Sequence, residues 1–271
     1  VGYVKIGGPT EERHILATLH DATYQFGIDY LRDVWYSTSY LLDRKQSMNG
    51  CAMKRFENYK QQPLEFVFDK SFTGKLSQFG LDPNRRTPSG IKAAIIREKG
   101  TNGEREMAYM LYLAGFDVKD VTMTDLISGR ETLEDINMVV YCGGFSNSDV
   151  LGSAKGWAGS FLFNPKAKAA LDNFYAREDT LSLGVCNGCQ LMMELGLITP
   201  EDKKKGKMLH NDSHKFESNF LGVTVPMNRS VMFGSLSGSK LGIWVAHGEG
   251  KFSLPYPEDH YNVVLKYSYD E

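Results

Sequence analysis

The sequence predicts an α/β protein built on a mostly parallel β-sheet, preceded by a smaller, mainly helical segment. Between residues 92 and 197, short apolar runs alternate with segments of helical periodicity, as in parallel strands joined by helices. Residues 76–90, rich in Gly, Pro, Asn and Ser, read as a linker that separates this part from the sequence before it. Beyond residue 206 the pattern becomes strand-rich. We therefore expect one larger α/β domain after a small N-terminal part.

The N-terminal part, residues 1–75, is expected to be mainly helical with a little β-structure. Apolar residues recur at intervals of three and four over 11–27 and again over 29–47, which predicts two helices. A short alternating run, 64–69, predicts one strand. The linker follows, and the α/β domain is expected to take residues 91–271.

In the α/β domain each expected element has its own local signal. Short apolar runs indicate buried strands, and apolar residues three and four apart indicate helices. The expected strands are 92–98, 117–123, 137–145 and 180–185, and the expected helices are 102–116, 165–178 and 187–197. In the strand-rich part, further strands are expected at 221–227, 230–235, 242–252 and 262–269.

Composition limits the classes of function. The chain has 271 residues, 42% of them apolar and 24% charged, as in an ordinary globular protein. A formal net charge of −2 offers no general attraction to nucleic acid or to an anionic membrane, so neither is an expected partner. Four cysteines are too few for a disulfide scaffold, and the first residues do not resemble a secretory signal. A cytoplasmic location is expected.

The run GVCNG, residues 184–188, is the first candidate for chemistry. It follows an expected strand, begins an expected helix, and has the form of the G-x-S-x-G nucleophile elbow with Cys186 in the serine position. A nucleophile on such a sharp turn needs small neighbours, which the two glycines provide. The helix that follows points its N-terminus at the sulfur and favours the thiolate. Cys186 is therefore a candidate nucleophile.

Two further motifs come at the ends of other expected strands. Paired glycines, Gly143 and Gly144, come at the end of the expected strand 137–145 and would let backbone N–H groups form an oxyanion hole with the N–H of Asn187. His247 and Glu249 lie two positions apart, so in an extended strand their side chains point to the same side. The carboxylate could then orient the imidazole, and the imidazole could take a proton from the thiol.

The cysteine pair also allows other interpretations. Cys186 and Cys189 form a C-x-x-C motif, which is often a redox pair or half of a zinc site. The nearest further zinc ligands in the sequence are Cys142, His210 and His214, and none of them completes a zinc-finger spacing. No metal site is therefore expected, and Cys189, one turn into the helix, is expected to pack in the core.

The motifs together resemble a known family. GVCNGCQLM (184–192), CGGFSNSDVLG (142–152) and AHGEGKF (246–252) resemble the glutaminase domain of class I glutamine amidotransferases. The forms C-N-G-C-Q and H-G-E-G are similar to those of the large, single-chain phosphoribosylformylglycinamidine synthases of purine biosynthesis. Residues 97–130 resemble the first strand, helix and second strand of that glutaminase domain, and 31–47 resemble the helical end of the synthetase portion.

The resemblance implies a flavodoxin-like, doubly wound fold and specific residue roles. Cys186 would attack the side-chain amide of L-glutamine to form a thioester and release ammonia, with His247 as general base and acid and Glu249 orienting it. Backbone amides of Gly144 and Asn187 would stabilise the oxyanion. The substrate would contact a further set of residues, which comprises Gly143, Gly144, Phe145, Asn187, Gln190, Phe216, Glu217 and Ser218.

Two departures from the family pattern are visible. Asn219 follows F-E-S where the family commonly has Arg, and the chain ends before the family's P-H-P-E-R segment. The glutaminase domain is therefore expected to be truncated at its C-terminus. The resemblance further implies that a synthetase domain upstream in the same polypeptide uses ammonia, ATP and Mg²⁺ to convert formylglycinamide ribonucleotide into formylglycinamidine ribonucleotide. This chain itself would hold no cofactor.

Two alternatives stay open. A related flavodoxin-like cysteine amidohydrolase or amidotransferase would use the same three side chains on another amide or with another acceptor. A non-catalytic module with this fold would be expected to lack one of Cys186, His247 and Glu249, and the sequence retains all three.

Overall fold

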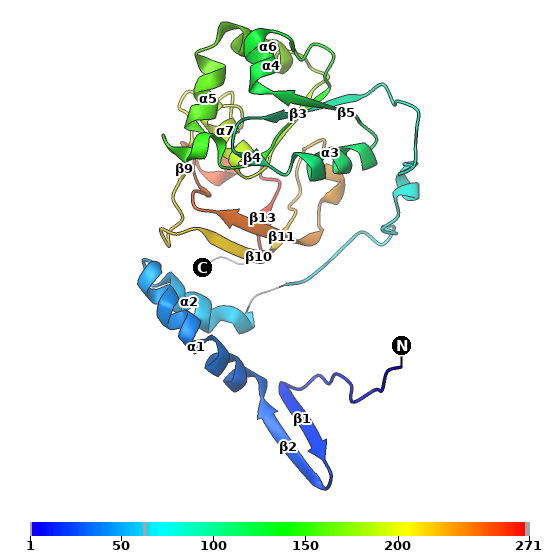
Figure 1. Ribbon diagram of the computed structural model, residues 1–271, viewed down its shortest axis with the longest axis vertical. Coiled ribbons are helices and arrows are strands. Elements are labelled where there is room, and N and C mark those ends of the chain that lie inside the picture. The colour runs from blue at the N-terminus through cyan, green and yellow to red at the C-terminus, as the bar shows by residue number, and fades with distance from the viewer. Residues whose placement is uncertain (1, 62–63, 269–271) are drawn as a thin grey trace. The chain divides into compact units, whose positions relative to one another are not determined.

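The structure is a computed structural model that describes residues 2–61 and 64–268, without the side chain of Lys60. The chain divides into two compact units (Figure 1). The first comprises Val1–Gln62 together with Asp212–Lys215, and the second comprises Pro63–Asn211 and Phe216–Glu271. In the part of the chain that the structure describes, no helix is both long and apolar enough to cross a membrane.

The first unit begins with a β-hairpin where a helix was expected over 11–27. Strands β1 (His14–Leu19) and β2 (Ala22–Gly27) pair antiparallel, with Leu19 opposite Ala22. The two residues between them form the turn, in which His20 has a φ of 56°. The helix prediction was wrong because apolar residues three and four apart also occur in two short strands joined by a tight turn.

Two helices complete the first unit. Helix α1 (Ile28–Gln46) confirms the expectation over 29–47, and α2 (Cys51–Asn58) follows it, so the small unit is mainly helical as expected. The guanidinium of Arg32 lies over the ring of Tyr59, 3.6 Å from its centroid, and donates to the Phe56 carbonyl at 2.7 Å. Cation–π contact of this kind is an attraction that adds to apolar packing.

A four-stranded parallel sheet forms the centre of the second unit (Figure 1). Its strands are β3 (Lys92–Arg97), β5 (Asp117–Thr122), β6 (Met138–Tyr141) and β8 (Leu181–Gly184). Their spatial order is β5-β3-β6-β8, and every neighbouring pair is parallel. This is the flavodoxin-like order, which confirms the expected fold class. The order reverses between β3 and β6, and such a switch point places ligands beyond the carboxyl ends of the strands.

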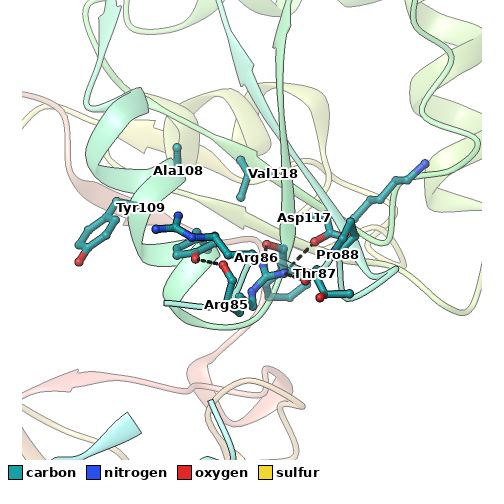
Figure 2. A pocket seen from close by; sticks show the side chains of 11 residues that line it. Arg85, Arg86, Thr87, Pro88, Ala108, Tyr109, Asp117 and Val118 are labelled. Atoms are coloured by element: carbon teal, nitrogen blue, oxygen red, sulfur yellow. Dashed lines mark hydrogen bonds and ion pairs between the residues drawn. The ribbon is translucent and has the colours of Figure 1, made fainter. Parts of the chain in front are cut away.

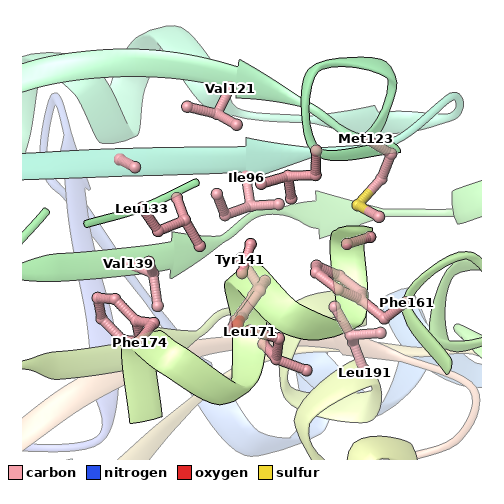
Figure 3. Packing of buried hydrophobic residues seen from close by; sticks show 14 of the residues in the cluster. Ile96, Val121, Met123, Leu133, Val139, Tyr141, Phe161, Leu171, Phe174 and Leu191 are labelled. Carbon is pink, nitrogen blue, oxygen red and sulfur yellow. The ribbon is translucent and has the colours of Figure 1, made fainter. Parts of the chain in front are cut away.

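Helices cover both faces of this sheet. Val139, Tyr141 and Ile96 pack toward one face with residues of the helices there (Figure 3). Ile95 and Val140 pack toward the other face, beside Leu111. The alternation follows from the two-residue period of a strand. On the first face lie α4 (Met123–Ser128), α5 (Lys155–Leu162), α6 (Pro165–Tyr175) and α7 (Asn187–Leu195), and on the second lies α3 (Glu104–Leu113).

Smaller antiparallel sheets make up the rest of the unit. They pair β11 with β10 and β10 with β13, β12 with β9, and β4 with β7. The strands are β4 (Thr101–Asn102), β7 (Gly143–Gly144), β9 (Lys207–Leu209), β10 (Glu217–Thr224), β11 (Lys240–His247), β12 (Lys251–Ser253) and β13 (Lys266–Tyr267). Short 3-10 turns occur at Tyr59–Gln61, Leu76–Phe79, Ser146–Asp149, Gly234–Leu236 and Glu258–His260.

The strand expected at 230–235 was wrong. The Ser230 hydroxyl accepts from the backbone N–H groups of Met232 and Phe233, at 3.2 and 3.3 Å. The Asn228 side chain accepts from the backbone of Ser230 at 3.0 Å. Such local bonds offer the backbone an alternative to a sheet ladder, and the segment folds into turns.

Two other expected strands are much shorter in the structure. The run 64–69 contributes a single bridge, between Val67 and Lys240. In the run 262–269, two residues are in a strand, and position 269 lies outside the described residues. Both runs therefore pair with strands of the β10–β11 sheet over a shorter length than their apolar pattern predicts.

Asp117, the first residue of β5, holds the linker against the sheet through its side chain (Figure 2). Its carboxylate accepts from the guanidinium of Arg85 at 2.9 Å and from the backbone N–H groups of Ser89 and Gly90 at 3.0 and 2.8 Å. The Tyr112 hydroxyl donates to the Arg85 carbonyl at 2.6 Å. Because hydrogen bonds to an ionised carboxylate favour the charged form, they lower the pKa of Asp117 to about 2.

This contact predicts a pH dependence of stability. With the folded-state pKa of Asp117 at about 2, below the ordinary 3.8, the contribution is complete above pH 4 and is lost as the pH falls toward 2. We expect Asp117→Asn to reduce the fall in the free energy of unfolding across that window. Denaturant titrations at several pH values would measure the free energy of unfolding of both proteins. If it falls equally steeply with pH in the variant, Asp117 is not the group responsible.

Candidate active site

Cys186 occupies a strained turn between β8 and α7. Its backbone has φ 52° and ψ −108°, outside the regions that ordinary residues adopt. A Cβ at Gly184 would lie 2.6 Å from the Gly188 carbonyl oxygen, and a Cβ at Gly188 would lie 2.7 Å from the Cβ of Tyr141. Both positions therefore require glycine, so the GVCNG run forms the sharp elbow that its spacing predicts.

Three strand ends meet around the Cys186 sulfur. The thiol is exposed and donates to the carbonyl of Ala246, the residue before His247, at 3.4 Å. A Cβ at Gly143 would lie 3.3 Å from the Cβ of Cys186. Segments that are far apart in the sequence, the elbow, the glycine pair and the H-G-E strand, thus come together as expected.

The glycine pair turns sharply after β6. Gly144 has a φ of 121°, and a Cβ there would lie 2.6 Å from the Gly100 carbonyl oxygen, so only glycine fits. The backbone N–H of Ser146, two residues on, donates to the Asn187 side chain at 3.1 Å, which joins this loop to the elbow. Asn187 is the first residue of α7, and its own N–H therefore has no acceptor within the helix.

Buried amides connect the elbow to the H-G-E-G turn. The Asn187 side chain donates to Gln190 Oε1 at 2.9 Å, and Gln190 Nε2 donates to the Glu249 carbonyl at 2.7 Å. Both side chains are buried. The amide of Gln190, expected to contact substrate, thus bonds to protein groups at both ends, and its contact with substrate stays a prediction.

His247 ends β11 with a half-buried ring. Its Nδ1 lies 2.9 Å from Asn211 Oδ1, and a Cβ at Gly250 would lie 2.5 Å from Nε2, so the ring packs on the backbone of that glycine. Burial lowers the pKa of His247, while the charge of Glu217, its cross-strand partner, acts in the opposite direction with a smaller effect. A neutral imidazole is the form that can accept a proton.

Glu249 interacts with His210 and Asp149. Its carboxylate is 3.9 Å from Nδ1 of His210, and its charge contributes, after burial, to raising the pKa of Asp149. The hydrogen-bonding partner of His247 Nδ1 is Asn211, which the sequence did not single out. No local pattern marks Asn211, because it lies 36 residues before His247.

The F-E-S segment begins β10 beside the strand of His247. Glu217 pairs with His247, and Ser218 pairs with Ala246. The rings of Phe216 and Phe145 are 6.2 Å apart, and both side chains are about half exposed, so these two expected substrate residues form one aromatic wall. Asn219, where the family commonly has Arg, accepts from the backbone N–H of Phe220 at 2.9 Å.

The second cysteine of the C-x-x-C pair differs from the first. Cys189 is half buried in α7, and burial raises the pKa of its thiol to about 11. All four cysteines are free. Among the residues that the structure describes, no group of three His, Cys, Asp or Glu side chains is arranged to hold a metal ion. Of the two thiols, the exposed one on the elbow has the geometry of a nucleophile.

Comparison with protein families gives a match over most of the second unit. Residues 90–270 match the family described as the CobB/CobQ-like glutamine amidotransferase domain. The matched segment includes the elbow, the glycine pair, the F-E-S segment and the H-G-E-G turn.

Two proteins similar in sequence to this chain carry the same enzyme name. The chain is 40% identical over 237 residues to the probable phosphoribosylformylglycinamidine synthase, chloroplastic/mitochondrial, of Arabidopsis thaliana, covering 83% of this chain and 16% of that protein. It is 48% identical over 198 residues to the probable phosphoribosylformylglycinamidine synthase of Caenorhabditis elegans, covering 72% of this chain and 14% of that protein. The chain thus spans about a sixth of the length of these relatives.

A solved structure has a similar fold. The structure of PurLQS from Thermotoga maritima matches with a TM-score of 0.51 and 28% sequence identity, over 67% of this chain and 76% of that one. The similarity agrees with the parallel sheet and its helices described above.

Proposed function

Because the chain belongs to the CobB/CobQ-like glutamine amidotransferase family, we propose that it is the glutamine-hydrolysing part of a phosphoribosylformylglycinamidine synthase. The observation that carries the proposal is the meeting of Cys186 on its strained elbow with the residue preceding His247, at 3.4 Å. A nucleophile, a base and backbone donors at one place are the parts that acyl transfer from an amide requires.

The reaction begins at the thiol. His247, neutral because burial lowers its pKa, takes the proton of Cys186, and the resulting thiolate attacks the side-chain carbonyl carbon of L-glutamine. The electron pair of the C=O bond moves to oxygen. The N–H of Asn187 at the start of α7 and that of Gly144 stabilise the oxyanion, with Gly143 leaving room beside the sulfur.

Collapse of this intermediate breaks the C–N bond. The imidazolium of His247 donates its proton to the leaving nitrogen, ammonia departs, and a glutamyl thioester remains on Cys186. Water, deprotonated by the same imidazole, then attacks the thioester carbonyl carbon. The C–S bond breaks, the imidazolium returns its proton to the sulfur, and glutamate and the free Cys186 thiol are released. Phe145, Phe216, Glu217 and Ser218 contact the amino-acid end of the substrate in this scheme, and Glu249 supports the charged imidazole from the same turn.

The ammonia serves a larger reaction in the full-length protein. An upstream synthetase domain of the same polypeptide uses it, with ATP and Mg²⁺, to convert formylglycinamide ribonucleotide into formylglycinamidine ribonucleotide. The names of the relatives, and the sixth of their length that this chain spans, support the assignment to this larger reaction. A cytoplasmic location is part of the proposal and rests on the composition of the sequence. Glutamine hydrolysis in this chain therefore supplies one substrate of that synthetase reaction.

Covalent labelling tests the proposal directly. A diazo-ketone analogue of glutamine should alkylate the full-length protein, and mass spectrometry should locate the adduct on Cys186, with Cys189 unmodified because burial raises its pKa to about 11. Excess L-glutamine should slow the labelling. Absence of an adduct on Cys186 while the synthetase substrates are present would contradict the proposal.

A further inference from the structure

Asn211 makes three side-chain hydrogen bonds to the turn that carries His247. Its Nδ2 donates to the His247 carbonyl at 2.7 Å, and its Oδ1 lies 2.9 Å from Nδ1 of the ring. The same Oδ1 accepts from the N–H of Gly250 at 3.2 Å. The Asn211 backbone N–H also donates to the Gly248 carbonyl at 2.9 Å, so one buried residue frames the whole turn.

These bonds determine which way the amide faces. A carbonyl oxygen can only accept, so the atom bonded to the His247 carbonyl must be the NH₂ group of Asn211. Oδ1 therefore faces the ring, and the N–H of Gly250, which can only donate, agrees with that orientation. An oxygen acceptor at Nδ1 requires a proton on Nδ1. In the neutral ring, Nε2 then carries the lone pair.

We propose that Asn211 is the positioning residue that holds His247 in the Nδ1–H form, with Nε2 free to take the proton of Cys186. This inference rests on the proposed function for its catalytic meaning. The partner of the imidazole is thus a neutral amide from a loop 36 residues away, in addition to any effect of Glu249, the carboxylate two residues on. In other nucleophile–base pairs, too, a third group orients the base.

Charged groups surround His247, whereas the side chain that bonds to its ring is neutral. Glu217 lies opposite His247 on β10, Glu249 lies on the turn after His247, and His210 lies in the loop that carries Asn211. A carboxylate in place of the amide could still accept from Nδ1 and Gly250 but would stabilise the imidazolium. Asn211→Asp should therefore keep His247 in the Nδ1–H tautomer and raise the pKa of its ring. Asn211→Ala should lose the hydrogen bond to Nδ1 and, with it, the fixed orientation of the ring.

Kinetics of the full-length protein test the role. We expect Asn211→Ala to lower kcat of glutamine hydrolysis by about 10²-fold, the lower end of what general acid–base catalysis contributes, with KM changed less than threefold, about 0.7 kcal/mol or less. Asn211→Asp should recover most of this loss and move the acidic limb of the kcat/KM profile to higher pH. Asn228→Ala, which removes a loop asparagine whose side chain bonds to the backbone of Pro226 and Ser230, should leave kcat unchanged.

A second measurement does not depend on turnover. Hydrogen exchange at the imidazole C2 position, followed by mass spectrometry of the His247 peptide, reports the pKa of that ring. Asn211→Asp should raise it relative to the wild type. If labelling of Cys186 fails but this shift is found, the proposed function is wrong and the contact is right. A natively folded Asn211→Ala protein with wild-type kcat, or an unchanged His247 pKa in Asn211→Asp, would overturn the positioning role.

Discussion

Replacing Cys186 with Ala should lower glutamine-dependent turnover of the full-length protein by about 10⁴-fold or more, the scale seen when a covalent nucleophile is removed. Neither neighbouring thiol can substitute, because Cys189 is half buried with its pKa raised to about 11, and Cys142 is buried with a similar shift. Turnover with added ammonia in place of glutamine should stay close to that of the wild type, since the proposed synthetase reaction does not need the thiol.

Cys189→Ala provides the matched control. It removes the other cysteine of the same motif, three residues on, and alanine is a good helix former. Steady-state assays with glutamine and with ammonia should find both activities retained in this variant. The nucleophile assignment fails if Cys186→Ala still hydrolyses glutamine at the wild-type rate, or if Cys189→Ala loses that activity while remaining folded.

Gly188→Ala should destabilise the second unit by roughly 3 kcal/mol or more, at the upper end of overpacking effects. The added methyl would lie 2.6 Å from the carbonyl carbon of Tyr141 and 2.7 Å from its Cβ. Tyr141 is fully buried at the end of a central strand and packs on Trp157 and Phe161, so it has no room to retreat. Any folded protein should also have a displaced elbow and little glutaminase activity.

Gly159→Ala is the control for that substitution. Gly159 also lies in a helix, α5, but there the new methyl would meet only the Phe163 side chain at 3.7 Å, an ordinary contact. Because alanine is favoured over glycine within a helix, this variant should gain about 0.5 to 1 kcal/mol. Denaturant unfolding of both variants measures the pair. Equal effects of the two substitutions would show that steric contact at the elbow is not what requires Gly188.

The α/β pattern and the elbow could be predicted because both depend on short-range spacing. Short apolar runs identified β3, β6 and β8, and the strand-like segment 117–123 identified β5. The glycines on either side of Cys186 are required because a Cβ at either position would clash with neighbouring atoms. Helices α4 and α5 were not expected, because α4 is only six residues long and the apolar residues of α5 are interrupted by two glycines.

Other expectations failed where the spacing of apolar residues is compatible with two different secondary structures. The apolar spacing over 11–27 suits one helix or two paired strands, and pairing across the turn at His20 gives the hairpin. The run at 230–235 is apolar enough for a strand, yet the side chains of Asn228 and Ser230 bond to the local backbone instead. Neither outcome can be read from hydrophobic periodicity alone.

The order of residues was enough to predict the elbow at Cys186 and the flavodoxin-like sheet, since a glycine-flanked cysteine and alternating strands and helices are local features. Folding over long separations selected the partner of the imidazole. Asn211 reaches His247 across 36 residues, while Glu249, only two residues away, lies beside His210. A hydrogen bond depends on where atoms lie in space, and spacing along one strand specifies only the side to which a residue points.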